Sequence, residues 1–249
     1  MSPRLAFALD AAVEAGRLTL AWFQGAGGFE LKEDASPVTA ADRAAERRLR
    51  DRIESTYPHE PILGEEEGGV AARNQWVIDP IDGTKSFVCG VPLYAVLLSY
   101  EDSEGPLIGV SYFPALDWLV YAERGHGAFA NGRPIRVSPQ TDLQEVVVCA
   151  GGHRSMEKHG RQGGFMRIAR EVMATRTWGD AYGHCMVAAG RAHAMIDPVV
   201  SKWDLSAVNL IVEEAGGRFT DFTGERQPQS EAVSSNGVLH DWLLEQLRG

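Results

Sequence analysis

Apolar residues recur at helical spacing in several stretches of the chain. Near the amino terminus a helical period predicts an amphipathic helix through Leu5, Leu9, Ala12, Val13, Gly16, Leu20 and Phe23. A second periodic run follows Thr39, which suits the N-cap position of a helix. The same reasoning predicts further helices at residues 155–173, 181–189, 203–215 and 240–247.

Between these helices, short runs rich in branched and aromatic residues predict strands. They fall at residues 61–63, 76–78, 93–100, 106–113 and 118–123, then at 146–149, near 176 and at 193–196. Residues 125–136 predict two more short strands, joined at Asn131-Gly132, a dipeptide that favours two-residue hairpins. We therefore expect an antiparallel middle block in an α/β protein, with a second half that opens at the 146–149 strand.

The stretch WVIDPIDGTKSF, residues 76–87, joins a predicted buried strand to polar side chains. Asp79 ends the apolar run, and Pro80 is expected to stop the strand because it has no backbone N–H to donate. Asp82 follows three residues after Asp79, and Gly83 then allows a close backbone approach that a side chain would block.

Two kinds of chemistry meet at the end of this stretch. Thr84 is predicted to be the N-cap of the next helix, and free amides at a helix start bind phosphate. The carboxylate oxygens of Asp79 and Asp82 are ligands that Mg²⁺ prefers. The same letters also suit an ordinary turn. This stretch alone leaves both interpretations open, a turn and a metal-assisted phosphoryl site.

Composition narrows the classes of function. The chain has 249 residues, of which 44% are hydrophobic, enough for a substantial core. Its formal net charge of −10 argues against a nucleic-acid or anionic-membrane surface, because both require clustered Lys and Arg. An anionic substrate is still allowed, since bound cations can reverse the local field.

Cysteine and hydropathy patterns bear on the compartment. The cysteines are few and widely spaced, so we expect buried free thiols rather than disulfides or structural zinc at Cys89, Cys149 and Cys185. The apolar run at residues 5–9 is too short for a signal peptide, and no run reaches membrane-spanning length. We therefore expect a cytoplasmic protein with neither nucleic acid nor membrane as a partner.

Four stretches together resemble the signatures of the inositol monophosphatase family of Mg²⁺-dependent, lithium-sensitive phosphatases. They are SPVTAAD at 36–42, GEE at 64–66, WVIDPIDGTKSF at 76–87 and WDLSAVNLIVEEAGG at 203–217. Their order and spacing follow the family pattern over nearly the whole chain. The resemblance implies the family's layered α-β-α-β-α sandwich, with residues 1–249 as a single domain. Two halves, about 1–140 and 141–249, would meet at its active site, and a homodimer is expected.

The resemblance also implies a set of metal ligands for two to three Mg²⁺ ions per site. Asp79 would be shared by two ions, and Glu65 would hold the first. Asp82 and Asp204 would hold the second, and Ile81 would contribute its backbone carbonyl. Without cations, carboxylates gathered in this way would repel one another and some would take up protons.

Further residues are implied in handling water and phosphate. Thr84, supported by Asp42, would orient the attacking water that Glu65 faces. The backbone amides of Gly83 and Thr84 would bind the phosphate group. Lys32, in the loop before the second helix, would neighbour the third metal position.

The second half of the chain bears on the substrate. TWGDAYG at 177–183 and the Asp197-Pro198 pair resemble the histidinol-phosphate phosphatase branch of the family. Asp180 stands where the inositol branch has a small residue, and its carboxylate would pair with the ammonium of an amino-alcohol phosphate. Asp197 stands where the family places an acid that contacts polar groups of the substrate. The resemblance thus implies hydrolysis of L-histidinol phosphate to L-histidinol and phosphate, with substrate contacts at Asp82, Gly83, Thr84, Asp180, Asp197 and Asp204.

Several alternatives stay open at the level of sequence. The substrate could be inositol-1-phosphate or a range of sugar phosphates, or the chain could be a non-catalytic, metal-binding regulatory protein with this fold. Plainer structural interpretations also exist. Asp42 and Asp204 would each complement a helix dipole, Asp180 would be an N-cap, and the acids at 65–67 would be solvated surface.

Overall fold

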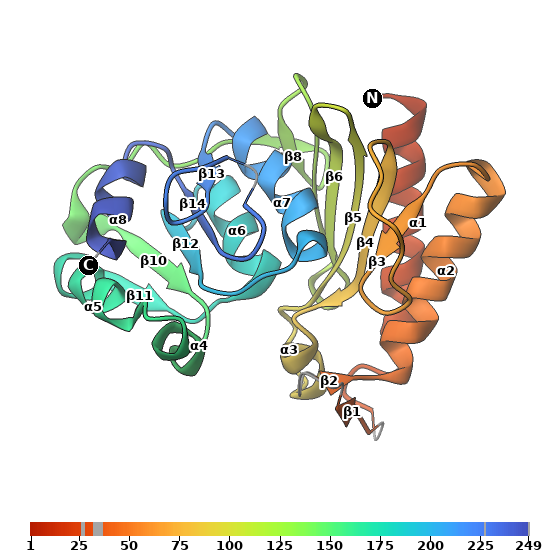
Figure 1. Cartoon of the computed structure of the whole chain (residues 1–249), viewed down its shortest axis with the longest axis horizontal. Coiled ribbons are helices and arrows are strands. Elements are labelled where there is room, and N and C mark those ends of the chain that lie inside the picture. Colours follow the sequence, from red (N-terminus) through yellow and green to blue (C-terminus); the bar gives the residue numbers. More distant parts are fainter. Residues whose placement is uncertain (26–27, 32–36, 227, 249) are drawn as a thin grey trace.

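The helices and strands lie in five layers, which Figure 1 shows from one side to the other. The computed structural model describes residues 1–25, 28–31, 37–226 and 228–248. At one side of the first sheet lie α1 (Pro3–Thr19) and α2 (Ala40–Thr56), and between the two sheets lie α6 (Asp180–Ala188) and α7 (Lys202–Glu214). The far side of the second sheet is covered by α4 (His153–Lys158), α5 (Gln162–Glu171) and α8 (His240–Leu247). The α-β-α-β-α order expected from the sequence is confirmed.

The first sheet has seven strands in the order β3-β4-β5-β6-β7-β8-β9. Its only parallel pair is β3 with β4, and all its other neighbours are antiparallel, as expected for the middle block. Asn131 and Gly132 both have positive φ, 47° and 78°, so the predicted hairpin turn is present. The strands are β3 (Ile62–Gly64), β4 (Gln75–Asp82), β5 (Ala95–Asp102), β6 (Gly105–Phe113), β7 (Trp118–Glu123), β8 (Ala128–Ala130) and β9 (Arg133–Ile135).

Burial along α7 explains its place between the sheets. Eight consecutive residues, 205 to 212, are buried, whereas α1 buries only one face, with Leu5, Ala8, Ala12 and Ala15 among its buried residues. A helix that is buried all round must be covered on every side. The sequence therefore places α7 in the interior and α1 on the outside.

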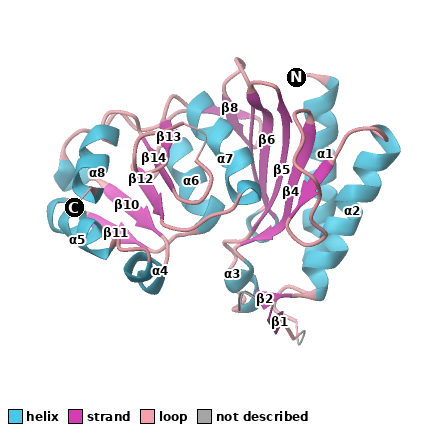
Figure 2. Ribbon diagram, in the orientation of Figure 1, coloured by secondary structure: helices cyan, strands magenta, loops and turns pink. Residues whose placement is uncertain are grey.

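The second sheet has five strands in the order β11-β10-β12-β14-β13 and combines parallel and antiparallel pairs (Figure 2). Its strands are β10 (Val147–Ala150), β11 (Ala174–Arg176), β12 (Ala194–Asp197), β13 (Arg218–Thr220) and β14 (Ala232–Ser235). The sequence pattern did not predict β13 and β14. The single helix expected at 155–173 is also wrong, because Gly160, at φ 70°, separates α4 from α5.

The strand that leads to the DPID corner is longer than expected. Pro80 does not stop β4, which continues to Asp82 across an irregularity in its pairing with β5 between Asp79 and Asp82. Such a bulge tolerates proline, because the residue inserted there has no ladder hydrogen bond to lose. The N-cap of α3 (Thr84–Val88) is Gly83, at φ 78°, and not Thr84, which is the first helical residue.

Smaller features complete the fold. Residues Glu30–Leu31 (β1) and Pro37–Val38 (β2) pair antiparallel near α3, and short 3₁₀ turns lie at Pro114–Leu116 and Leu143–Glu145. Cys149 and Cys185 are buried free thiols as expected, but Cys89 is exposed. Over the described ranges, none of the helices combines the length and apolarity needed to cross a bilayer.

Candidate active site

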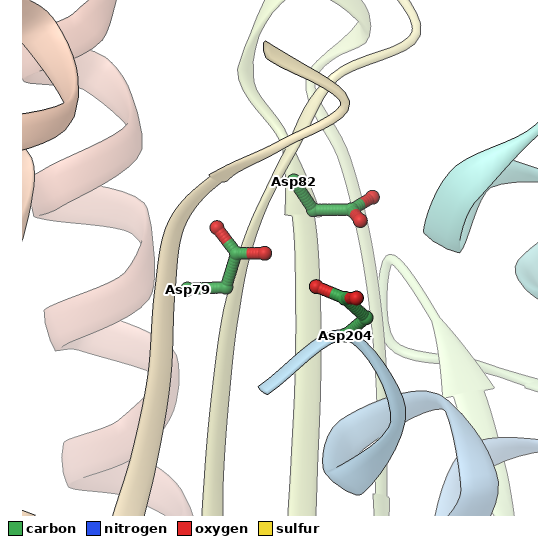
Figure 3. A group of neighbouring side chains, drawn as sticks. All are labelled: Asp79, Asp82 and Asp204. Atoms are coloured by element: carbon green, nitrogen blue, oxygen red, sulfur yellow. The ribbon is translucent and has the colours of Figure 1, made fainter. Parts of the chain in front are cut away.

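Three aspartates from distant parts of the chain point toward one another between β4 and α7 (Figure 3). Asp79 and Asp82 come from the end of β4, and Asp204 comes from the first turn of α7. One carboxylate oxygen of each lies within 4.8 Å of those of the other two. The packing of α7 against the first sheet therefore gathers acids from both halves of the chain at one place.

Each aspartate is held by a backbone amide. The amide of Ile81 donates to Asp79 Oδ1 at 3.0 Å, and the amide of Ala181 donates to Asp82 Oδ2 at 2.8 Å. The amide of Ser201 donates to Asp204 Oδ2 at 2.7 Å, as part of the capping box that begins α7. One oxygen of each carboxylate is thus fixed to the backbone, which orients the group in the cluster.

Burial dominates the electrostatics of the cluster. It raises the pKa of Asp79 well above its ordinary value, and the charge of Glu65 adds to the shift. Burial followed by the charges of Asp180 and Asp204 raises the pKa of Asp82 well above its ordinary value. The pKa of Asp204 rises to about 7, mainly through burial, although the Ser201 amide opposes the shift. Nearby cations would reverse these shifts, because opposite charge favours the ionised form.

The cluster opens into a pocket of about 150 Å³. Most of the residues predicted for the site line it, namely Glu65, Asp79, Ile81, Asp82, Gly83, Thr84, Asp180, Asp197 and Asp204. Lys85, Ala181, His184, Val199, Val200 and Pro37 complete the wall. Acids therefore outnumber the cationic side chains on this wall.

Asp180 sits in an unusual backbone conformation. It is the first residue of α6, with φ 57°, and Gly179 is the N-cap, so the N-cap interpretation of Asp180 is wrong. A Cβ on Gly83 would lie 3.1 Å from Asp180 Oδ2, which brings the two signature stretches into contact. Burial raises the pKa of Asp180, and the charge of Lys85 opposes the shift. Left-handed, non-glycine residues with buried polar groups are concentrated at functional sites.

Thr84 and Asp42 lie close to the site but do not contact each other in the expected way. The Thr84 hydroxyl donates to the Ile81 carbonyl at 3.0 Å. Asp42 closes the capping box of α2, where its Oδ2 accepts from the amide of Thr39 at 2.7 Å and from its hydroxyl at 2.6 Å. Asp42 Oδ1 is buried and, among the described residues, has no hydrogen-bond partner. Asp42 is also absent from the residues that line the pocket.

Some residues of the site were not singled out in the sequence. Lys85 lines the pocket, and its position inside the 76–87 signature was the available signal. His184 lines the pocket with a buried imidazole, and burial lowers its pKa to about 3. Glu46, fully buried in α2, accepts from the amides of Glu66 and Glu67 and so holds the GEE loop. Lys32 lies outside the described residues.

A converging set of buried carboxylates beside the start of a helix is typical of metal-dependent enzymes that act on phosphate groups. Comparison with known proteins supports this class. The model of the inositol monophosphatase family matches residues 1–249. A histidinol-phosphatase of Chlorobaculum parvum is 41% identical over 245 residues, which cover 96% of this chain and 94% of that protein.

Two further relatives extend the comparison. An inositol-1-monophosphatase of Mesorhizobium japonicum is 33% identical over 253 residues, which cover 96% of this chain and 94% of that protein. The solved structure of the IMPase of Thermotoga maritima superposes with a TM-score of 0.92 at 33% identity, covering 99% of this chain and 97% of that one. The chain belongs to the inositol monophosphatase family and is a phosphoric monoester hydrolase.

Proposed function

We propose that this chain is a Mg²⁺-dependent phosphatase that hydrolyses L-histidinol phosphate to L-histidinol and phosphate. The observation that supports this choice of substrate is a pair of acids, Asp180 and Asp197, which line the pocket in addition to the aspartate cluster. Relatives named histidinol-phosphatase, from Chlorobaculum parvum and Mycobacterium tuberculosis, are 41% and 39% identical to it.

The residues present fit Mg²⁺. Carboxylate and carbonyl oxygens are the ligands of hard cations, and three carboxylates lie within 4.8 Å of one another with one oxygen of each anchored to the backbone. The ligands we assign are Glu65, Asp79, Asp82, Asp204 and the carbonyl of Ile81. Two to three bound ions would offset the phosphate charge and lower the pKa of an attacking water.

The chain's own residues position the phosphate and the water. The amides of Gly83 and Thr84, both on the pocket wall, bind the phosphate oxygens. Thr84 donates its hydroxyl proton to Ile81, so its oxygen is available to accept from the attacking water that Glu65 faces. For Asp42 to support Thr84, the Thr84 hydroxyl would have to turn from the Ile81 carbonyl, which we assign to the metal, and donate to Asp42 Oδ1, the oxygen that the capping box does not use.

The two acids Asp180 and Asp197 in the pocket wall favour a cationic substrate group. Burial, then the charges of Asp180 and Asp204, raises the pKa of Asp197 well above its ordinary value. An ammonium placed between Asp180 and Asp197 would stabilise both carboxylates in their charged form. An amino-alcohol phosphate carries such a group, whereas an inositol phosphate offers only hydroxyls.

The test compares kcat/KM for L-histidinol phosphate and inositol-1-phosphate at one Mg²⁺ concentration. L-histidinol phosphate should be preferred, and Asp180→Asn should lower its kcat/KM about tenfold or more, because a hydrogen bond to a charged group contributes roughly 1.5–3 kcal/mol. Asn tolerates the positive φ of position 180, so the variant changes charge at little backbone cost. Its kcat/KM for inositol-1-phosphate should change far less.

Other outcomes would redirect the proposal. A preference for inositol-1-phosphate would favour the second candidate, which the 33% identical inositol-1-monophosphatase supports. Equal and feeble values for both compounds would leave neither as the substrate. Metal binding with no phosphate release from any ester would instead indicate a regulatory protein that has kept the fold.

We further propose that the two halves, about 1–140 and 141–249, form one domain and that the protein is a cytoplasmic homodimer. Free thiols fit a reducing compartment. Sedimentation equilibrium on the full chain would measure the assembly, and a monomer across the micromolar range would contradict the dimer.

A further inference from the structure

A buried carboxylate lies at the junction of β4, β5 and α7, away from the pocket. Glu101, on β5, is 7% exposed. Its Oε2 accepts from Gln75 Nε2 at 2.9 Å and lies 2.7 Å from Lys202 Nζ. Its Oε1 accepts from Ser206 Oγ at 2.8 Å. One side chain therefore holds a residue of β4 and two residues of α7.

The two α7 contacts share one face of the helix. Lys202 and Ser206 are four residues apart, so they lie one above the other on the helix surface. Asp204 lies midway between them in sequence, about 200° of helix rotation from Lys202. The first turn of α7 is thus gripped by Glu101 on one side, while Asp204 reaches the aspartate cluster from the other side.

The pairing of β4 with β5 also relates the position of Glu101 to that of the aspartate cluster. Gln75 pairs with Glu101, Val77 with Ser99 and Asp79 with Leu97. Residues two apart on a strand share a face, so Gln75 and Asp79 lie on the same face of β4. Side chains at the start of α7 therefore reach two places on this face, with Lys202 and Ser206 at the Gln75–Glu101 pair and Asp204 near Asp79.

Helix α7 packs so closely on the first sheet that it cannot move nearer to the sheet. A Cβ on Gly109 of β6 would lie 2.4 Å from the carbonyl oxygen of Ala207. The backbones of β6 and α7 are thus in direct contact, which fixes the depth of the helix. The contacts of Glu101 with Lys202 and Ser206 add polar anchors that oppose a rotation of the helix about its axis.

We infer that Glu101 is a positioning residue, which sets the rotation of α7 and thereby keeps Asp204 opposite Asp79 and Asp82. The inference rests on the metal assignment proposed above. Metal binding requires the carboxyls of the cluster to ionise, and like charges then push Asp204 away from β4. The grip of Glu101 on Lys202 and Ser206 opposes that displacement and holds the three carboxylates at a separation that a divalent ion can bridge.

The test measures Mn²⁺ binding to the full chain by electron paramagnetic resonance, with no substrate present. Glu101→Gln puts an amide NH₂ where a carboxylate oxygen accepts from Lys202, Gln75 or Ser206. Its Mn²⁺ dissociation constant should rise about 10- to 100-fold, the range seen when groups that orient metal ligands are removed. Glu104→Gln, a matched change at a side chain that is 78% exposed, should leave the constant unchanged.

A double-variant cycle separates positioning from general damage. In the Asp204→Asn background, adding Glu101→Gln should weaken Mn²⁺ binding less than twofold further, because the ligand that Glu101 positions is already lost. An unchanged constant in Glu101→Gln alone, or full additivity in the double variant, would overturn the inference. If Glu101→Gln does not fold, Ser206→Ala takes its place in the same cycle, with a smaller expected rise. Absence of Mn²⁺ binding by the wild-type chain would instead sink the metal assignment itself.

Discussion

Two groups of buried acids in this molecule are neutralised in opposite ways. Glu46 of α2 is fully buried, and its carboxylate accepts from Arg50 Nε at 2.9 Å and from the amides of Glu66 and Glu67 at 2.8 and 2.9 Å. The aspartates at 79, 82 and 204 are also buried or nearly so, but they face one another. The cation that neutralises Glu46 is therefore Arg50, a residue of the same chain.

The difference teaches what each group is for. A buried ion pair with all its hydrogen bonds made fixes a loop, here the one that carries Glu65. A cluster of carboxylates with raised pKa values is costly for the fold alone, and it becomes favourable only when a cation arrives from solution. Substitutions that remove one charge should therefore have opposite effects on stability in the two groups.

The largest effect is expected from Asp79→Asn. Loss of a carboxylate shared by the proposed ions should lower Mg²⁺-dependent kcat/KM by more than about 100-fold, since even residues that only orient ligands are worth 10- to 100-fold. The metal-free variant should melt no lower than wild type, because the amide is neutral in the buried cluster at every pH, whereas Asp79 must take up a proton to become so. Phosphate release and calorimetry would measure the two effects. Near-wild-type turnover of the variant at low Mg²⁺ would contradict the role of Asp79 as a metal ligand, and with it the contrast with Glu46.

Glu46→Gln should do the reverse. Breaking a buried ion pair by removing one partner costs about 3–5 kcal/mol, so the free energy of unfolding in urea should fall by roughly that amount without metal. Arg50, whose side chain is 11% exposed, would keep only its longer contact with Glu67, 3.6 Å from Nε to Oε2. Glu104→Gln is the surface control and should change stability by less than about 0.5 kcal/mol. Equal stability of the two variants would contradict the structural role of Glu46.

A smaller effect should appear as pH dependence without metal. A carboxyl whose folded pKa is raised, as that of Asp204 is to about 7, makes the folded state bind more protons than the unfolded state. Its contribution is complete below the unfolded pKa and is lost as pH rises through the folded pKa. Between pH 6.5 and 8.5 the melting temperature of the metal-free protein should therefore fall relative to that of the Mg²⁺-saturated protein, by about 2–4 °C for each kcal/mol lost.

Buried histidines act in the opposite direction over part of this window. Burial lowers the pKa of His184 to about 3, that of His240 to about 4 and also that of His193, so all three favour the folded state more as pH rises through their unfolded value of 6.5. At pH 6.5 the unfolded imidazole is still half protonated, which leaves about 0.4 kcal/mol per histidine to be gained above that pH. The histidine contribution is present with and without Mg²⁺, so the difference between the two melting curves measures the cluster, and parallel curves would remove the aspartate cluster as the cause.

Local signals made much of the first sheet predictable. Asn131 and Gly132 favour the positive φ angles that a two-residue hairpin needs. The apolar runs at 106–113 and 118–123 are separated by residues that break strands. The second sheet was harder to predict from the sequence. Its strand β14 is the short run AVSS, which has low β-propensity and is defined by its pairing with β12 and β13. Tertiary pairing determined this strand.

The site shows the same division. The sequence motifs predicted which acids belong to the site. Asp79, Asp82 and Asp204 were each identified by the residues that flank them in those motifs. No local pattern indicates that Glu101 meets Lys202, or that Asp180 adopts a positive φ, since both follow from contacts between distant segments. Pro80 was misleading because a bulge, not a strand end, accommodates it.

The origin of the cluster in β4 and α7 has a consequence for synthesis of the chain. A ribosome delivers Asp79 and Asp82 early and Asp204 only after the whole of the first sheet has emerged. The nascent polypeptide therefore meets the mutual repulsion of these acids only when α7 docks, at the close of assembly. The divalent ions proposed above would then stabilise the product of that final step, whereas no earlier step brings all three acids together.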